Sequence, residues 1–270
     1  MPELPEVETT RRGLEPVVVG QSIASLTVRE RRLRWPVARN LAERLRDRQI
    51  LSLGRRGKYL LVNLRDGSLI VHLGMSGSLR LVPTGQAPGN HDHVDINLSG
   101  GDCLRFNDPR RFGSLHFSAS PERHKLLRNM GPEPLGEAFG ADYLWQASRQ
   151  RRVAIKQHLM NSRVVAGVGN IYANEALFRA GIHPTRAAGR IARARFVPLT
   201  DAIRAVLTDA LSFGGTTLRD FVGGDGRPGY FKQSLQVYDR AGQPCRRCAK
   251  PIRLKVQGQR ATYYCANCQR

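Results

Sequence analysis

The chain has 270 residues, 41% of them hydrophobic, so it can bury a core and form one large domain or two medium ones. Its 43 Lys and Arg residues against 22 Asp and Glu residues give a formal net charge of +21, more than solubility requires. Such an excess favours a polyanionic partner, although a merely solvated basic surface would also fit the charge. No run of about 18 apolar residues and no signal peptide is found, which disfavours a membrane as that partner.

The basic residues are clustered. Residues 143–174 include five bases and no carboxylate, and residues 239–270 include eight bases opposed only by Asp239. Clusters of this kind are typical of surfaces that neutralise phosphates. We therefore expect a nucleic-acid partner and a cytoplasmic location.

The N-terminal half predicts a short helix followed by strands. The helix is expected over residues 6–14, with Pro5 near its first turn and Pro16 just beyond its end. From about residue 21 to 117 short strands alternate with turns, which predicts an antiparallel sandwich or barrel. The clearest strands flank Asp66-Gly67 and Gly100-Gly101 and cover residues 58–64, 68–73, 94–98 and 103–106.

After the Pro-rich stretch 131–134 the pattern changes to a helical period, which favours a domain boundary there. Two or three helices are expected between residues 142 and 184, interrupted by a glycine-bearing turn at 165–170. A mobile glycine-rich stretch is expected at 223–229. One face of a single long helix is indicated by Phe196, Leu199, Ile203, Val206, Leu207, Ala210 and Leu211.

Four of the five cysteines form the pattern Cys245-x2-Cys248-x16-Cys265-x2-Cys268. This spacing predicts a structural zinc site, with a hairpin of residues 252–256 and 261–264 joined through Gly258. Two disulfides are the alternative, but nothing marks the chain as secreted. Residues 239–270 are too few to hold a core alone, and structural zinc contributes about 10–16 kcal/mol in small finger peptides. The fifth cysteine, Cys103, is expected to be a small buried hydrophobe.

Several motifs follow one another along the chain. They are the opening Met1-Pro2-Glu3-Leu4-Pro5-Glu6-Val7-Glu8-Thr9, then residues 55–58, 72–77, 108–113 and 167–172, and the four-cysteine finger. In kind and order they resemble the motifs of bacterial formamidopyrimidine-DNA glycosylases, and the resemblance covers the whole chain. It implies an α+β multidomain fold: an N-terminal antiparallel β-sandwich with flanking helices (1–131), a helix-two-turn-helix domain with a lesion-capping loop (132–238) and a zinc-finger β-hairpin (239–270).

The resemblance also implies a function. Members of this family excise oxidised purines from damaged double-stranded DNA through a Schiff base on the N-terminal proline and then nick the strand by β,δ-elimination. The resemblance implies one structural Zn²⁺ and a monomer.

The chemistry of the opening can be argued directly. If Met1 is removed, Pro2 exposes a secondary amine, and an α-amino group has a pKa of about 7.7–8.0, so a usable fraction is neutral at pH 7. Attack of such an amine on a sugar C1′ gives an iminium, a covalent electron sink. By resemblance Pro2 is this nucleophile, and Glu3 is the acid that protonates the sugar ring oxygen. Glu6 either orients the terminal amine or favours the helix start through the helix dipole.

Two basic residues are implied in the eliminations. Lys58, expected at a strand start, resembles the proton donor of β-elimination, although a plain phosphate contact would also explain it. Arg260, expected in the hairpin turn, resembles the arginine that grips the phosphates beside the lesion and assists δ-elimination.

Further residues are implied in DNA binding. His91, Arg110, Arg151 and Asn170 correspond to DNA contacts, Asn170 beside a helix N-terminus suited to phosphate. An everted nucleotide leaves a gap in the duplex, which the family fills with a wedge that falls here on Met75, Arg110 and Phe112. Taken singly, Met75 and Phe112 would more often be core residues, but their glycine-flanked loop positions weaken that alternative. The lesion pocket falls, with the weakest correspondence, on Lys156, Thr217, Leu218, Arg219, Asp220 and Phe221.

Two other readings are open. Endonuclease VIII shares the proline chemistry and the finger but removes oxidised pyrimidines; Leu4 after Glu3, and Arg110 with Phe112 in one loop, favour the purine enzyme. A DNA-binding or damage-signalling protein without catalysis would be expected to have lost Pro2, Glu3 or Lys58.

Overall fold

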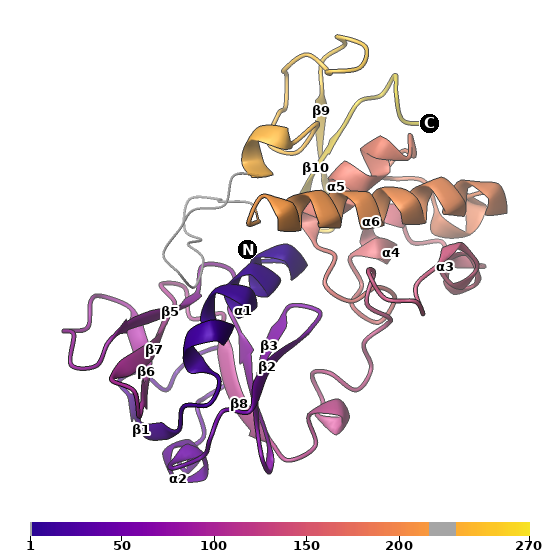
Figure 1. Cartoon of the computed structure of the whole chain (residues 1–270). Coiled ribbons are helices and arrows are strands. Elements are labelled where there is room, and N and C mark those ends of the chain that lie inside the picture. Colours follow the sequence, from indigo (N-terminus) through magenta and orange to yellow (C-terminus); the bar gives the residue numbers. More distant parts are fainter. Residues whose placement is uncertain (1, 216–230) are drawn as a thin grey trace. The chain divides into compact units, whose positions relative to one another are not determined.

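The computed structural model describes residues 2–215 and 231–270 (Figure 1). These residues group into two compact units, one made of Met1–Arg128 with Leu211–Lys232 and the other of Asn129–Ala210 with Gln233–Arg270. None of the described helices is long and apolar enough to cross a membrane.

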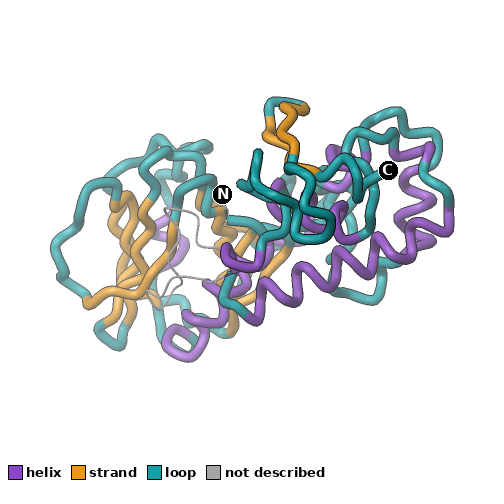
Figure 2. The backbone as a smooth tube through the Cα atoms, turned by 90° about the horizontal axis from the view of Figure 1, so that it is seen from above, coloured by secondary structure: helices purple, strands orange, loops and turns teal. Residues whose placement is uncertain are grey.

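The first unit is built around two antiparallel sheets (Figure 2). One sheet has the order β1-β6-β7-β5 and the other β2-β3-β4-β8, and residues of both sheets share one apolar core. Its strands are β1 (Ile23–Val28), β2 (Ser52–Arg56), β3 (Tyr59–Leu64), β4 (Gly67–His72), β5 (Ser78–Pro83), β6 (Asp92–Leu98), β7 (Asp102–Asn107) and β8 (Ser114–Ser118). The predicted antiparallel sandwich is confirmed, and Cys103 is buried in it as expected.

The first helix is longer than the sequence pattern indicated. α1 spans Leu4–Val18 and contains Pro16, which had been expected just beyond its end. Pro16 lies on the exposed side of the helix, so water can hydrate the carbonyl group that its missing N–H leaves without a helical partner. Burial of Leu14 and Val18 on the opposite side favours the extra turn. The first unit also contains the short helices α2 (Leu41–Leu45) and η1 (Pro121–Arg123).

The second unit is helical. Its elements are α3 (Ala141–Ser148), α4 (Ile155–Leu159), α5 (Asn170–Arg179), η2 (Ala188–Arg190), η3 (Arg193–Arg195), α6 (Phe196–Ser212) and η4 (Phe231–Ser234). The last two residues of α6 and the first two of η4 are grouped with the first unit. The predicted long helix is confirmed as α6. Six of its seven predicted apolar residues are buried, and the seventh, Leu211, is partly buried.

A two-stranded hairpin, β9 (Arg253–Gln257) and β10 (Arg260–Tyr264), lies near the end of the chain. Gly258 and Gln259 have φ angles of 54° and 60°, as the two central residues of a type I′ turn require. The hairpin packs on α5, where Asn174 accepts the Tyr263 N–H at 2.9 Å. The predicted hairpin is therefore present, and it shares its small core with a helix of the same unit.

Candidate active site and metal centre

The chain enters its first helix through two buried residues, Pro2 and Glu3. Glu3 is 1% exposed and is the N-cap of α1. Its backbone N–H donates to Oε2 of Glu6 at 2.8 Å, one half of a capping box. Because the peptide after Pro2 takes part in this cap, the start of α1 sets the position of Pro2.

Glu6 is buried and has a second neighbour besides Glu3. The backbone of Gly215 packs on it, since a Cβ atom at Gly215 would lie 3.3 Å from Glu6 Oε1. Gly215 has a φ angle of +83°, which favours glycine. Glu6 lies in the first turn of α1, where it accepts the Glu3 N–H, and no local pattern in the sequence indicated the contact with Gly215.

Lys58 lies in the two-residue turn between β2 and β3, after Gly57, rather than at a strand start. Gly57 has a φ angle of 58°, and glycine is favoured at the first central position of a type II′ turn. Arg55 donates from Nη1 to the Gly57 carbonyl at 3.0 Å and from Nε to the Glu8 carboxylate at 3.1 Å. Glu8 belongs to α1, so the Lys58 turn is tied to the helix that carries Glu3.

A partly buried histidine, His72, lies next to this turn. The ring of His72 packs on that of Tyr59 with centroids 4.7 Å apart. Burial, and then the charges of Lys58 and Arg34, lower the pKa of His72 from 6.5 to about 4. The imidazole is therefore neutral at neutral pH. Its Nδ1 accepts the N–H of Gly74 at 3.0 Å, which places the ring proton on Nε2.

Two loops carry the three expected wedge residues. Met75 lies between β4 and β5, and Arg110 and Phe112 lie between β7 and β8. Met75 is 37% and Phe112 39% exposed, so neither is a core residue. The guanidinium carbon of Arg110 lies 5.0 Å from the centroid of the Phe112 ring. His91 is exposed beside the second loop, where its carbonyl accepts the N–H of Asp108 at 3.0 Å.

Four sulfur atoms come together in the second unit. The Sγ atoms of Cys245, Cys248, Cys265 and Cys268 all lie within 4.8 Å of one another, and no cysteine in the described part of the chain is in a disulfide. The Cys245–Cys268 and Cys248–Cys265 distances are 3.9 Å and 3.5 Å. Ligands of a tetrahedral zinc with Zn–S bonds of about 2.3 Å lie about 3.8 Å apart. The cluster fits one zinc ion and fills its coordination sphere, as a structural site requires.

Two side chains hold β10 against the helices. Nζ of Lys156, which is 1% exposed, donates to the Ala261 carbonyl and to the Thr262 hydroxyl, both at 2.7 Å. Asn170, the first residue of α5, donates its amide to the same Ala261 carbonyl at 3.1 Å. Ala261 follows Arg260, which is exposed at the start of β10. These contacts therefore set the place of Arg260 on the unit.

The structure places Lys156, expected as a lesion contact, against the hairpin. A buried ammonium group needs polar partners, and the hairpin supplies them. The other residues expected in the lesion pocket lie outside the described residues: Thr217, Leu218, Arg219, Asp220 and Phe221.

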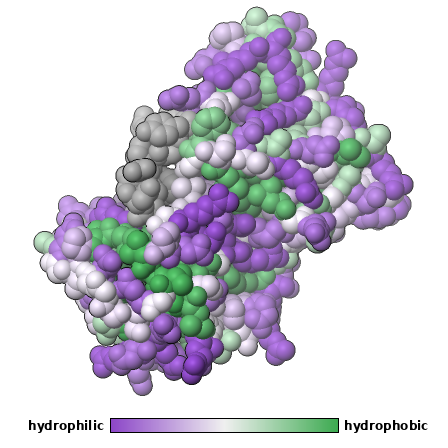
Figure 3. Space-filling view, viewed as in Figure 1, coloured by the Kyte–Doolittle hydropathy of each residue, from purple (hydrophilic) through white to green (hydrophobic). Residues whose placement is uncertain are grey.

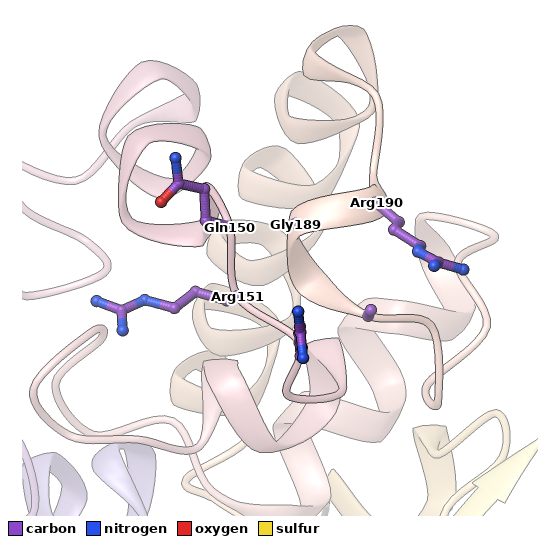
Figure 4. A pocket seen from close by; sticks show the side chains of 6 residues that line it. Gln150, Arg151, Gly189 and Arg190 are labelled. Atoms are coloured by element: carbon purple, nitrogen blue, oxygen red, sulfur yellow. The ribbon is translucent and has the colours of Figure 1, made fainter.

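Arg151 borders an open hollow in the second unit (Figure 4). The hollow has a volume of about 670 Å³ and is lined by Gln150, Arg151, Arg152, Ala187, Gly189 and Arg190. The side chains of Arg151 and Arg190 extend in opposite directions. Within the described part of the chain, no carboxylate pairs with the three arginines, so the hollow remains positively charged. Hydrophilic side chains also cover much of the visible face of each unit (Figure 3).

Three family models match successive parts of the chain. They are the N-terminal domain of formamidopyrimidine-DNA glycosylase at residues 1–115, its H2TH domain at 130–222, and the zinc finger found in FPG and IleRS at 242–270. A formamidopyrimidine-DNA glycosylase of Methylococcus capsulatus is 59% identical over 271 residues, which cover all of both chains. This chain belongs to the formamidopyrimidine-DNA glycosylase family.

Solved structures of formamidopyrimidine-DNA glycosylases share its fold. The crystal structure of the MutM (FPG) protein from Thermus thermophilus has a TM-score of 0.90 at 40% identity, covering 99% of this chain and 98% of that one. A Lactococcus lactis FPG mutant, in complex with a Fapy-dG containing DNA, has a TM-score of 0.92 at 34% identity, covering 99% of each chain. The cysteine cluster is accordingly the zinc finger of this formamidopyrimidine-DNA glycosylase.

Replacing Cys248 with Ala is expected to release the zinc and unfold residues 239–270. Without the metal the finger keeps only a small core: Phe178, Val237, Cys245, Ile252 and Cys265. Arg260 would then lose its fixed place, while the two sheets of the first unit stay folded. Metal analysis and hydrogen exchange of the hairpin amides measure the effect.

Cys103→Ala is the matched control, because Cys103 is buried in β7 and lies in the other unit. This variant should keep one zinc per chain. A Cys248→Ala protein that retained zinc and protected hairpin amides would contradict the assignment.

Proposed function

We propose that this formamidopyrimidine-DNA glycosylase excises oxidised purines, 8-oxoguanine and formamidopyrimidines, from duplex DNA and then nicks the strand at the abasic site. The observation that carries the proposal is the buried start of α1, which holds an N-terminal proline next to an acid, Pro2 and Glu3. The Lactococcus lactis relative bound to Fapy-dG DNA supports the lesion class. The protein acts in base excision repair, as a monomer in the cytoplasm.

In the first step the Pro2 nitrogen attacks C1′ of the damaged nucleotide. The N–C1′ bond forms and the bond from C1′ to the base breaks. The base leaves with the electron pair of that bond and takes up the proton that the Pro2 amine loses. The Glu3 carboxyl gives a proton to the sugar ring oxygen, so the ring opens and an iminium remains on Pro2. Met1 must be removed beforehand, because a retained methionine would occupy the amine. Glu6 supports this arrangement through its bond to the Glu3 N–H.

The iminium then serves as the electron sink for two eliminations. Lys58 acts as proton donor in β-elimination, supported by the tie between its turn and α1 through Arg55 and Glu8. Arg260 grips the phosphates beside the lesion and assists δ-elimination, supported by the fixed position of β10.

The chain is divided into three domains with different roles. Residues 1–131 form the catalytic domain, residues 132–238 the helix-two-turn-helix domain with the lesion-capping loop, and residues 239–270 the zinc finger. Phosphate and base contacts come from His91, Arg110, Arg151 and Asn170. Met75, Arg110 and Phe112 fill the gap that the everted nucleotide leaves, for which exposed apolar side chains are suited.

Single-turnover excision on matched duplexes tests this function. Duplexes with 8-oxoguanine or a formamidopyrimidine opposite cytosine should be cleaved faster than one with thymine glycol, an oxidised pyrimidine. Faster cleavage of the thymine glycol duplex would favour the endonuclease VIII alternative. Binding of damaged DNA with no excision of any base would favour a damage-binding protein without catalysis.

Arg110→Ala is expected to narrow the preference for cytosine over adenine opposite 8-oxoguanine. The proposed target of Arg110 is the estranged cytosine, and a good base contact discriminates by about 1–3 kcal/mol, or about five- to 150-fold. Excision rates on the four opposite-base duplexes at one salt concentration measure the change. If Arg110→Ala slows all four by a common factor, Arg110 is only a phosphate contact.

Arg151→Ala serves as the comparison variant, because Arg151 is exposed at the basic hollow and is assigned to phosphate. Contacts to phosphate do not depend on the base sequence, so Arg151→Ala should weaken binding to every duplex by the same factor. The slope of log K against log salt should become shallower by up to about 0.9.

A further inference from the structure

A buried carboxylate joins the two loops that carry the exposed apolar residues Met75 and Phe112. Oδ1 of Asp108 accepts the hydroxyl of Ser76 at 3.1 Å, and Oδ2 accepts the backbone N–H of Gly113 at 2.7 Å. Ser76 directly follows Met75, and Gly113 directly follows Phe112. One side chain therefore holds the neighbour of each of the two apolar residues. Asp108 is completely buried, so neither bond competes with water.

The backbone of Asp108 fixes the third member of the group. Its carbonyl accepts the N–H of Arg111 at 3.2 Å, which closes a turn with Pro109 and Arg110 at its centre. Asp followed by Pro is a favoured start for such a turn. Nε2 of His93 also contacts the Asp108 carbonyl, at 2.9 Å. Arg110 thus lies at the tip of a turn whose base is held from two sides.

The two loops also touch through glycines. A Cβ atom at Gly74 would lie 2.5 Å from the backbone nitrogen of Gly113, and Gly74 has a φ angle of +68°. The backbones of the Met75 loop and the Phe112 loop are therefore too close for a side chain at Gly74, and the Asp108 side chain bridges the two loops. Both hydrogen bonds of this bridge are buried, so it is suited to fix the relative position of the loops.

We infer that Asp108 is a positioning residue that presets Met75, Arg110 and Phe112 as one rigid wedge before DNA binds. The inference rests on the proposed function, since a wedge matters only if a nucleotide is everted. Side chains that are already ordered in the free protein lose less conformational entropy when DNA binds. A small displacement of these three side chains would slow eversion of the nucleotide and excision of the base.

A double-mutant cycle between Ser76→Ala and Met75→Ala tests the inference. Ser76→Ala removes only the bond between Asp108 and the Met75 loop. We expect single-turnover excision of 8-oxoguanine opposite cytosine to slow by about three- to tenfold in the otherwise unaltered protein. In the Met75→Ala background the same change should slow excision less than about twofold, because the side chain that the bond positions is gone.

Ser78→Ala is the matched control for the cycle. Ser78 lies two residues further on, in β5, and among the described residues its hydroxyl takes part in no hydrogen bond. This variant should leave the excision rate unchanged in both backgrounds. Thermal unfolding of each variant shows whether all are folded at the assay temperature.

Asp108→Asn and Asp108→Ala give a second measurement. An amide can direct its oxygen to the Gly113 N–H and its NH₂ group to the Ser76 hydroxyl oxygen, which can accept a hydrogen bond. Asp108→Asn should therefore retain more excision activity than Asp108→Ala, and Asp108→Ala should be slower than Ser76→Ala.

Three results would contradict different parts of this account. If Ser76→Ala slows excision equally in both backgrounds, or not at all, Asp108 does not act through the wedge. If Met75→Ala alone leaves the rate unchanged, the wedge assignment fails and the inference with it. Absence of excision on every lesion duplex would overturn the proposed function itself.

Discussion

Replacing Glu3 with Gln should remove most base excision while sparing the nicking of a preformed abasic site. Glutamine has nearly the same size and keeps the backbone N–H that Glu6 accepts, so α1 should begin unchanged. It cannot supply the carboxylic proton, and general acid catalysis contributes about 10²–10⁴-fold. Single-turnover excision of 8-oxoguanine should therefore slow by at least about 10²-fold. Nicking of an abasic duplex should fall less than about tenfold, because that substrate has already lost its base.

Glu15→Gln provides the matched control for this prediction, since it is the same substitution within α1, the helix that Glu3 caps. Glu15 pairs with Arg11 at 2.7 Å, and its side chain is 40% exposed. Exposed ion pairs contribute little to stability, so both rates should remain unchanged. Equal losses on the two substrates for Glu3→Gln would mean that Glu3 supports the helix rather than opening the sugar ring.

The sheets of the first unit could be predicted from sequence because their signals are local. Short strand-like segments flank Asp66-Gly67 and Gly100-Gly101, and the structure pairs β3 with β4 and β6 with β7 around them. The end of α1 could not be predicted in the same way. Pro16 is a local stop signal, and it was outweighed by the burial of Val18, which depends on packing against distant strands.

In the candidate site too, features with a local sequence signal could be predicted, and contacts between distant residues could not. The cysteine pattern is a local motif, so its metal site could be argued from spacing. The roles of Pro2 and Glu3 were implied by the resemblance to the family, beside the general chemistry of a terminal proline amine. The position of Lys156 could not be predicted in this way, because its partner Thr262 is 106 positions away in the sequence. Asp108 was part of a motif that matched the family, yet its bond to Ser76 spans 32 positions and has no signature in the sequence.

The nucleophile is the central claim. Removal of Met1 leaves Pro2 with a secondary amine that can form an iminium directly, and its position is set by the capped start of α1. Pro2→Gly replaces that amine with a primary amine on a flexible residue. We expect this variant to form much less covalent adduct, with the excision and nicking activities reduced together.

Borohydride trapping of the protein on a duplex with 8-oxoguanine opposite cytosine, followed by peptide mapping by mass spectrometry, tests this claim most directly. Borohydride reduces the iminium to a stable amine, so the residue that carried the intermediate keeps the sugar. Our account predicts that the adduct lies on an N-terminal peptide that begins at Pro2 and lacks Met1. An adduct on the peptide that contains Lys58, with Pro2 unmodified, would contradict it.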